Sequence, residues 1–210
     1  MNDFVLLASA SPRRHEILTQ LGIEHAVLHV PPPAGEDEPR LVGEPAADYV
    51  RRTARNKAQH ARAWLQAGGR PPGAVPPDWP THWPQCPILT ADTTVSIDDE
   101  VLGKPLDAAD AARMLRRLSG GRHQVLTAVA LQAHGQLHQA ISVSHVWLQR
   151  LTASDIDRYI ASGEPFGKAG AYAIQGRAAA FITRLEGSYT GVMGLPAHET
   201  TQLLRAAHAT

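Results

Sequence analysis

Hydrophobic and polar residues follow two different periods along the chain, and together they predict an α/β fold. Residues 4–7 and 24–30 are short apolar runs typical of strands. Apolar residues recur at helical spacing between these two runs and again, over a longer stretch, at 46–66. The alternation predicts a mixed, twisted sheet flanked by helices rather than a regular βαβ array.

The rest of the chain continues this alternation. We expect, in order, a strand over 88–91 that ends at Asp92 and continues over 93–97, a helix capped by Asp107 and ended by Gly120, a hairpin of 125–132 and 137–149, a helix from Thr152 to Gly163, a strand over 181–185 and a helix over 196–207. The alternating pattern of the hairpin predicts that one of its faces is solvated.

Residues 68–87 interrupt the pattern. They contain seven prolines and two of the four tryptophans, with almost no periodicity. Such a composition is typical of a loop. We therefore expect a surface loop inserted into a single domain that spans residues 1–210.

The bulk composition excludes several classes of protein. The 210 residues carry 20 basic and 20 acidic side chains, and this balance argues against a general nucleic-acid or membrane-surface binder. The single cysteine, Cys86, excludes an internal disulfide framework, and the 11 histidines show no metal-ligand spacing. No stretch resembles a signal peptide or a membrane span, so we expect a cytoplasmic protein.

The first candidate site is the turn between strand and helix that begins at Ser9. Ser11 is expected at the helix N-cap, with Pro12 at the first helical position. Arg13 and Arg14 follow in the first turn, where cations are unfavourable because the helix dipole is positive there. A bound phosphate would remove this conflict, since N–H groups, two hydroxyls and two guanidinium groups suit an anion. The alternative is a solvated arginine pair beside an ordinary cap.

Other charged residues add to the candidate site. Lys57 falls on the apolar face of the predicted helix 46–66, where burial is costly unless the ammonium group meets an anion or reaches solvent. Asp92 lies at the carboxyl end of a predicted strand, where α/β folds usually present catalytic groups. The full candidate set is Ser9, Ser11, Arg13, Arg14, Lys57, Lys104 and Lys168 on the cationic and hydroxyl side, and Glu38 and Asp92, with Asp37 as a weaker candidate, on the acidic side.

This mixture suits a polyphosphate bound with a divalent metal. Lysines and arginines offset phosphate charge, whereas carboxylates such as Glu38 and Asp92 hold Mg²⁺ and leave coordination places for water. One carboxylate can then take a proton from an attacking water. Nothing supplies a serine nucleophile with its attendant histidine and acid, so covalent acyl chemistry is disfavoured.

Ordered motifs over residues 7–204 carry a resemblance to a known family. The most specific are L-A-S-A-S-P-R-R (7–14), A-D-T-T-V (91–95), G-K-P (103–105), M-L-R-R-L-S-G (114–120), K-A-G-A-Y-A-I-Q-G (168–176) and G-L-P (194–196). The chain thereby resembles the Maf proteins, which are nucleoside triphosphate pyrophosphatases. The resemblance implies two lobes around a cleft, akin to inosine triphosphate pyrophosphatases, and a Mg²⁺- or Mn²⁺-dependent reaction that releases pyrophosphate. A homodimer is a further expectation of the resemblance.

The resemblance also implies roles for the candidate residues. Asp92 matches the proton acceptor, and Glu38 matches a carboxylate that helps to bind the metal together with Asp92. The polar groups that match the triphosphate site are Ser9, Arg13, Arg14, Lys57, Lys104 and Lys168, and the predicted N-cap Ser11 belongs with them.

Three positions bear on the base. Arg13, Thr93 and Gln175 resemble the branch that acts on dTTP and UTP, whereas the branch that acts on 7-methyl-GTP typically has Trp, Gln and Glu there. A glutamine amide offers both a donor and an acceptor to the imide edge of uracil or thymine. Gly167, where the family commonly has aspartate, and Ala173, which replaces a usual glycine, are departures that bear on fine specificity.

We therefore expect a pyrophosphatase for dTTP, UTP and modified pyrimidine nucleotides. One alternative within the class is a 7-methyl-GTP pyrophosphatase. The alternative from another class is a nucleotide-binding regulator of cell division that does not hydrolyse its ligand. Asp92 and Glu38 argue against the regulator, because binding alone needs no base.

Overall fold

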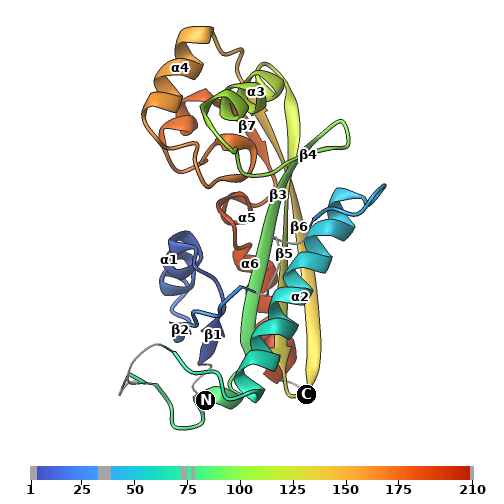
Figure 1. Ribbon diagram of the computed structural model, residues 1–210, viewed down its shortest axis with the longest axis vertical. Coiled ribbons are helices and arrows are strands. Elements are labelled where there is room, and N and C mark those ends of the chain that lie inside the picture. The colour runs from blue at the N-terminus through green and yellow to red at the C-terminus, as the bar shows by residue number, and fades with distance from the viewer. Residues whose placement is uncertain (1–3, 33–38, 72–74, 77–78, 209–210) are drawn as a thin grey trace.

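A mixed sheet runs along the long axis of the molecule (Figure 1). The computed structural model describes residues 4–32, 39–71, 75–76 and 79–208, and in these ranges the sheet has seven strands. Six follow the order β2-β1-β3-β5-β6-β7, and β4 pairs with the end of β3. Their bounds are Val5–Leu7 (β1), His25–Val27 (β2), Ile88–Ile97 (β3), Glu100–Leu102 (β4), Arg122–Ala133 (β5), Gln136–Leu148 (β6) and Ile182–Glu186 (β7).

Helices cover both faces of this sheet, which confirms the predicted α/β fold. α2 packs on β3 and β5, whereas α5 and α6 pack on the opposite face of β5 and on β6. The helices are Pro12–Gln20 (α1), Ala46–Gln66 (α2), Ala108–Leu118 (α3), Ala153–Ala161 (α4), Tyr189–Met193 (α5) and Ala197–His208 (α6), with short 3₁₀ turns at Trp83–Gln85 (η1), Ala169–Ala171 (η2) and Arg177–Phe181 (η3).

The strand β5 is buried on both faces. Leu126 and Ala128 pack against α2, while Val129 and Leu131 pack against Leu195 and its neighbours on the other side. The predicted solvated face of the hairpin is therefore wrong for β5, and only β6 keeps an alternating exposure. The physical reason is that helices cover the central strand on both sides, so that it reads as a nearly continuous apolar run.

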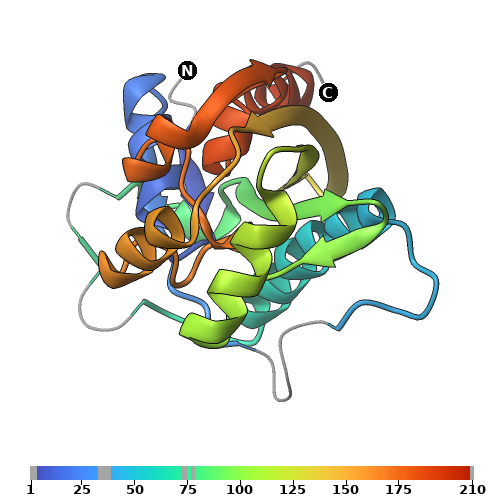
Figure 2. The ribbon, with the colours of Figure 1, turned by 90° about the horizontal axis from the view of Figure 1, so that it is seen from above.

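The sheet carries two lobes, as the resemblance implies. In the upper lobe of Figure 1, α3, α4 and β4 enclose a core that contains Leu115 and Ile156. In the lower lobe, α1 and β1 share a second core with α6, built around Ile17 and Leu203. Seen from above, α1 and α2 lie on opposite sides of the molecule (Figure 2).

One edge of β3 is uncovered along part of its length. The parallel strand β1 pairs with β3 only as far as Leu89, and the antiparallel β4 begins to pair at Val95. Between these points the described strands leave the edge open, and Asp92 lies in this interval. The prediction that Asp92 ends a strand is therefore wrong, because β3 continues unbroken along β5. Asp92 instead lies within β3, and its side chain projects from the face of the sheet toward α2.

The proline-rich stretch contributes to the core at its C-terminal end. Trp83 and Cys86 are buried and share a cluster with Leu6 and Ile88. Trp79 packs edge-on against Trp83, with ring centroids 5.2 Å apart. Trp83 and Cys86 therefore join the core, while their neighbours Thr81, His82 and Gln85 are exposed.

Helix caps follow the sequence closely. The side chain of Asp107 accepts a hydrogen bond from the backbone N–H of Asp110, and Thr152 forms a capping box with Asp155. These caps confirm the predicted starts of α3 and α4.

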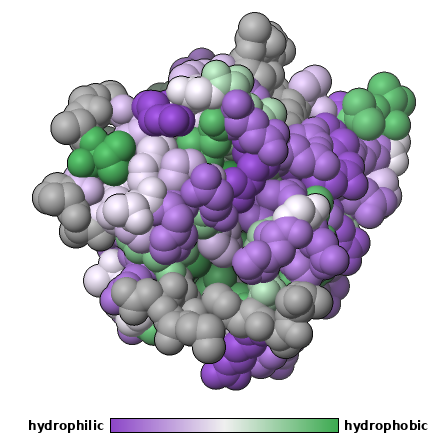
Figure 3. Space-filling view, turned by 90° about the horizontal axis from the view of Figure 1, so that it is seen from below, coloured by the Kyte–Doolittle hydropathy of each residue, from purple (hydrophilic) through white to green (hydrophobic). Residues whose placement is uncertain are grey.

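Among the described helices, none is both long enough and apolar enough to cross a bilayer. On the face that Figure 3 shows, hydrophilic residues prevail and hydrophobic ones form small, separate patches.

Candidate active site

A cleft of about 1110 Å³ lies between the two lobes, beside the uncovered edge of β3. It gathers every predicted site residue that the structure describes, from six separate parts of the chain. These residues are Ser9, Ser11, Arg13, Arg14, Lys57, Asp92, Thr93, Lys104, Lys168 and Gln175. Glu38 and Asp37 lie outside the described residues.

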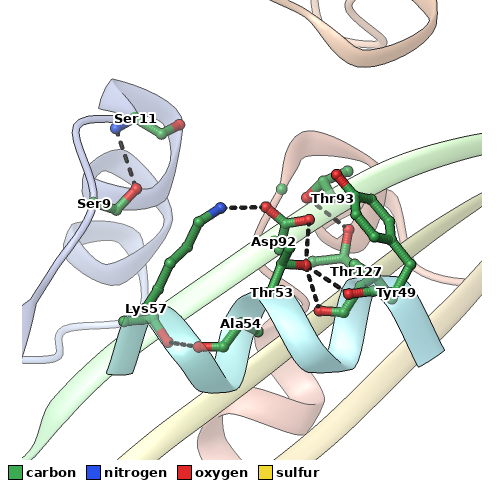
Figure 4. A network of polar contacts seen from close by, with 12 residues as sticks. Ser9, Ser11, Tyr49, Thr53, Ala54, Lys57, Asp92, Thr93 and Thr127 are labelled. Carbon is green, nitrogen blue, oxygen red and sulfur yellow. Dashed lines mark hydrogen bonds and ion pairs between the residues drawn. The ribbon is translucent and has the colours of Figure 1, made fainter. Parts of the chain in front are cut away.

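Asp92 faces α2 across the cleft floor (Figure 4). One carboxylate oxygen forms an ion pair with the ammonium group of Lys57, and the other lies 3.0 Å from the hydroxyl of Thr53. The side chain of Lys57 is 44% exposed, whereas that of Asp92 is 16% exposed. Lys57 therefore both meets an anion and reaches solvent, which explains a lysine beside an apolar helix face.

Thr53 is a contact that sequence reasoning missed. Its hydroxyl oxygen lies 2.7 Å from the carbonyl oxygen of Tyr49 and 3.2 Å from that of Val50, besides the contact with Asp92. A hydroxyl has one proton, so only one of these three acceptors can receive it at a time. Thr53 is buried on the inner face of α2. The sequence did not single it out, because a threonine on the inner face of a helix is typical of ordinary packing.

Arg14 is fixed by three groups from three separate parts of the chain. Its Nε donates to the carbonyl of Gly194 at 2.8 Å, Nη1 donates to the hydroxyl of Ser9 at 3.0 Å, and Nη2 lies 3.5 Å from the hydroxyl of Thr93. Desolvation lowers the pKa of Arg14, although the nearby charge of Asp92 acts to raise it. Its neighbour Arg13 donates from Nε to the carbonyl of Met193 at 3.1 Å.

These two arginines are held by the C-terminal end of α5. The carbonyls of Met193 and Gly194 belong to the last turn and cap of that helix, where the dipole is negative and cations are favourable. Gly194 adopts a φ of +121°, which favours glycine. Sequence reasoning did not find this contact, because the two partners are 180 residues apart.

The start of α1 has the predicted arrangement with one difference. Ser11 is the N-cap and Pro12 the first helical residue, but the side chain of Ser11 makes no capping hydrogen bond. The hydroxyl of Ser9 instead accepts from the backbone N–H of Ser11 at 3.2 Å (Figure 4). The first turn holds no acidic residue, so the positive helix end and Arg13 and Arg14 share one wall of the cleft.

We call Ser9, Arg13, Arg14 and Thr93 the arginine wall. Thr93 belongs to it because its hydroxyl faces Arg14. That hydroxyl is also hydrogen-bonded to the hydroxyl of Thr127 at 2.9 Å, and Thr127 donates to the carbonyl of Gly191 at 2.7 Å. Arg13 and Thr93, two of the three positions predicted to bear on the base, therefore lie in this wall.

The lysine rim, Lys104 and Lys168, comes from two neighbouring loops of the upper lobe. The backbone N–H of Gly170 donates to the carbonyl of Gly103 at 3.0 Å and joins the loops. Gly170 has a φ of +68°, and a Cβ there would lie 2.8 Å from a methyl carbon of Val95, so only glycine allows this approach.

The two rim lysines differ in their surroundings. Lys104 is exposed, whereas Lys168 is half-buried and donates to the carbonyl of Phe166 at 3.2 Å. Burial, and then the charge of Arg13, lower the pKa of Lys168.

The described residues fit a metal that arrives with the substrate. Asp92 is the single carboxylate among the described residues that line the cleft, and no described group of three His, Cys, Asp or Glu residues could hold a metal by itself. Mg²⁺ commonly takes one or two protein carboxylates and completes its shell with water and substrate phosphates. Asp92 can supply one such ligand, and Glu38 is the predicted second.

Comparisons with known proteins identify the family of this chain. The sequence model of the family described as Maf-like protein matches residues 4–207, so the chain belongs to the Maf family. A protein of Bordetella avium named dTTP/UTP pyrophosphatase is 54% identical over 201 residues, which cover 96% of this chain and 94% of that protein.

More distant relatives carry the same name. A Burkholderia thailandensis protein is 50% identical over 209 residues, covering 98% of this chain and 93% of its own length. A Cupriavidus pinatubonensis protein is 48% identical over 209 residues, covering 99% and 98%. Both are named dTTP/UTP pyrophosphatase.

Proposed function

We propose that this protein is a nucleoside triphosphate pyrophosphatase that hydrolyses dTTP and UTP to the monophosphate and pyrophosphate. The observation that carries the proposal is the similarity, at about half identity over nearly the whole length, to several proteins that bear this name. The cleft supports it independently, because it gathers cationic side chains around one carboxylate.

In the proposed reaction, water attacks the α-phosphorus while Asp92 takes its proton. A bond forms between the water oxygen and that phosphorus, the bond from the phosphorus to the α,β-bridging oxygen breaks, and pyrophosphate leaves with the bonding electron pair. Asp92 suits the role because it is held by Thr53 and Lys57 and stands on a rigid strand rather than on a loop.

The cations of the cleft would offset the charge of the triphosphate. Arg13 and Arg14 are hydrogen-bonded to backbone carbonyls before any substrate binds, so their positions need little reorganisation during the reaction. Lys57, Lys104 and Lys168 complete the cationic set. A divalent metal, Mg²⁺ or Mn²⁺, would supply further charge neutralisation and acidify bound water, with Asp92 and Glu38 as the ligands we propose.

The base would be read by Gln175, with Arg13 and Thr93 as the other positions of the predicted set. Gln175 is exposed on the cleft surface, where its amide can present a donor and an acceptor to uracil or thymine. Modified pyrimidines with an intact imide edge belong to the same substrate class.

The test is pyrophosphate release by the purified protein with Mg²⁺ or Mn²⁺ across the common nucleoside triphosphates and 7-methyl-GTP. We expect pyrophosphate release to be fastest with dTTP and UTP. Release should stop when the metal is chelated. A preference for 7-methyl-GTP would keep the mechanism and overturn the base assignment. Nucleotide binding without turnover would instead favour the regulatory alternative.

A further inference from the structure

Two residues with no role in the proposed reaction support the loop that carries Gln175. They are Tyr159 and Glu164, and we call them the brace. Tyr159, at the end of α4, is buried in the upper core. Its hydroxyl donates to a carboxylate oxygen of Glu164 at 2.8 Å and accepts from the backbone N–H of Ala173 at 3.3 Å. One side of the loop is thus joined to the core through Ala173.

Glu164 holds the other side of the same loop. Its carboxylate accepts from the backbone N–H of Arg177 at 2.9 Å and from that of Ala178 at 3.3 Å. Gly176 lies directly beneath it, because a Cβ at Gly176 would come within 2.3 Å of a carboxylate oxygen. Burial acts to raise the pKa of Glu164, but these N–H groups and the Tyr159 hydroxyl outweigh burial and lower the pKa. The Glu164 carboxyl group is therefore ionised.

The brace therefore clamps the chain on both sides of Gln175. Within the clamped segment the backbone N–H of Gly176 donates to the carbonyl of Ala173 at 3.0 Å, which closes a tight turn around Gln175. The fixed turn holds the backbone of Gln175 at one place beside the cleft, so its amide can meet a bound base, whereas on a free loop the side chain could move away from the base.

We propose that Tyr159 and Glu164 are positioning residues that set base selectivity by holding Gln175. This inference rests on the proposed function, in which Gln175 reads the base. UTP and CTP provide the probe, since they differ at the pyrimidine edge: uracil presents an N3–H donor and an O4 acceptor, and cytosine presents the reverse.

The experiment measures kcat and KM for UTP and for CTP in the wild-type protein and in Glu164→Gln, Tyr159→Phe and Gln175→Ala. We expect each substitution to reduce the UTP-to-CTP ratio of kcat/KM by roughly tenfold, mainly through a higher KM for UTP, because the phosphate-binding groups are unchanged. Tyr159→Phe keeps the ring in the core and serves if Glu164→Gln does not fold.

A double variant separates positioning from general stability. If Glu164 acts through Gln175, adding Glu164→Gln to Gln175→Ala produces no further loss of selectivity. Additive losses would overturn the proposal. So would an equal fall in kcat for both nucleotides, which would instead assign Glu164 to its electrostatic contact with Lys168.

The matched control is Asp155→Ala, which removes the acceptor of the capping box at the opposite end of α4. It should lower the melting temperature and leave the ratio unchanged. A wild-type protein without UTP preference, or an unchanged ratio in Gln175→Ala, would refute the proposed reading of the base. A normal preference that survives in both brace variants would refute the positioning inference alone.

Discussion

The arginine wall and the lysine rim face the same cleft, but the fold holds them in different ways. Each arginine of the wall donates to a backbone carbonyl at the end of α5, and Arg14 also reaches Ser9 and Thr93. In the rim, Lys104 is exposed, and Lys168 is hydrogen-bonded to the carbonyl of Phe166, two residues away in its own loop. The wall is built from the lower lobe and α5, and the rim belongs to the upper lobe.

The difference separates two uses of positive charge. Groups that must stabilise a transition state gain from fixed positions, because no reorganisation is needed during the reaction. Groups that attract an anion and help to retain it can remain mobile, since their Coulomb attraction depends weakly on direction. We therefore expect substitutions in the wall to lower kcat and substitutions in the rim to raise KM.

The largest effect should come from the carboxylate between the two regions. Asp92→Asn removes the proposed base and keeps the size of the side chain, so we expect kcat to fall by roughly 10³-fold while nucleotide binding persists. Asp99→Asn is the matched control: this residue lies in the turn after β3 at a φ of +62°, a conformation that asparagine tolerates. Retention of most activity in Asp92→Asn would remove it from the base role.

A smaller loss is expected for Arg14→Lys. A lysine keeps the charge but cannot donate to Gly194 and Ser9 at the same time as it faces phosphate, so kcat should fall by roughly 30-fold, or about 2 kcal/mol. Arg13→Lys, which gives up a single carbonyl contact, should cost less. Equal losses in the two variants would contradict the idea that the hydrogen-bond network fixes the wall.

Lowering the pH should reduce the stability of the protein through His123, which contacts the core of the upper lobe at Tyr172. Burial lowers the pKa of His123 to about 4 from an ordinary 6.5, and His123 is hydrogen-bonded to the Tyr172 hydroxyl at 2.8 Å. As the pH falls below 6.5 the unfolded chain takes up this proton before the folded chain does, so stability is lost between pH 6.5 and 4. From pH 7 to 5, the free energy of unfolding should fall by about 2 kcal/mol more in the wild type than in His123→Gln. Parallel denaturant titrations at the two pH values measure this difference. An identical change in unfolding free energy in the two proteins would exclude His123 as the source of the acid sensitivity.

The smallest effect belongs to the rim. Lys104→Ala should raise KM by roughly fivefold at low salt, and the effect should shrink as salt screens the exposed charge. Arg116→Ala, an exposed cation of α3 outside the cleft, is the control. A fall in kcat at unchanged KM would instead indicate that Lys104 stabilises the transition state, as we expect of the arginine wall.

The sequence predicted most elements and most of the candidate site, because local signals define them. Caps such as Asp107 and Thr152 locate helices by their own hydrogen bonds, and ordered motifs identified residues that do converge on one cleft. The uncovered edge at Asp92 could not be predicted, since it depends on where the neighbouring strands β1 and β4 pair.

The supports of the site escaped prediction for the same reason. Thr53 and Glu164 have no local signature, and their roles come from contacts with groups on other elements. Partners such as the backbone carbonyl of Gly194 cannot be recognised from residue types, because every residue has a carbonyl group. Sequence patterns thus indicated which groups gather in the cleft, while tertiary contacts determine how firmly each is held.

The 180-residue separation between Arg13 and Met193 has a consequence for biosynthesis. A ribosome that adds ~5–20 residues per second makes the arginines on the order of 10–40 s before the carbonyls that orient them. During that interval the nascent chain has the cationic turn but not its support. Competence for catalysis therefore arises only near the end of translation, and any truncation before α5 would leave the arginine pair without its anchor.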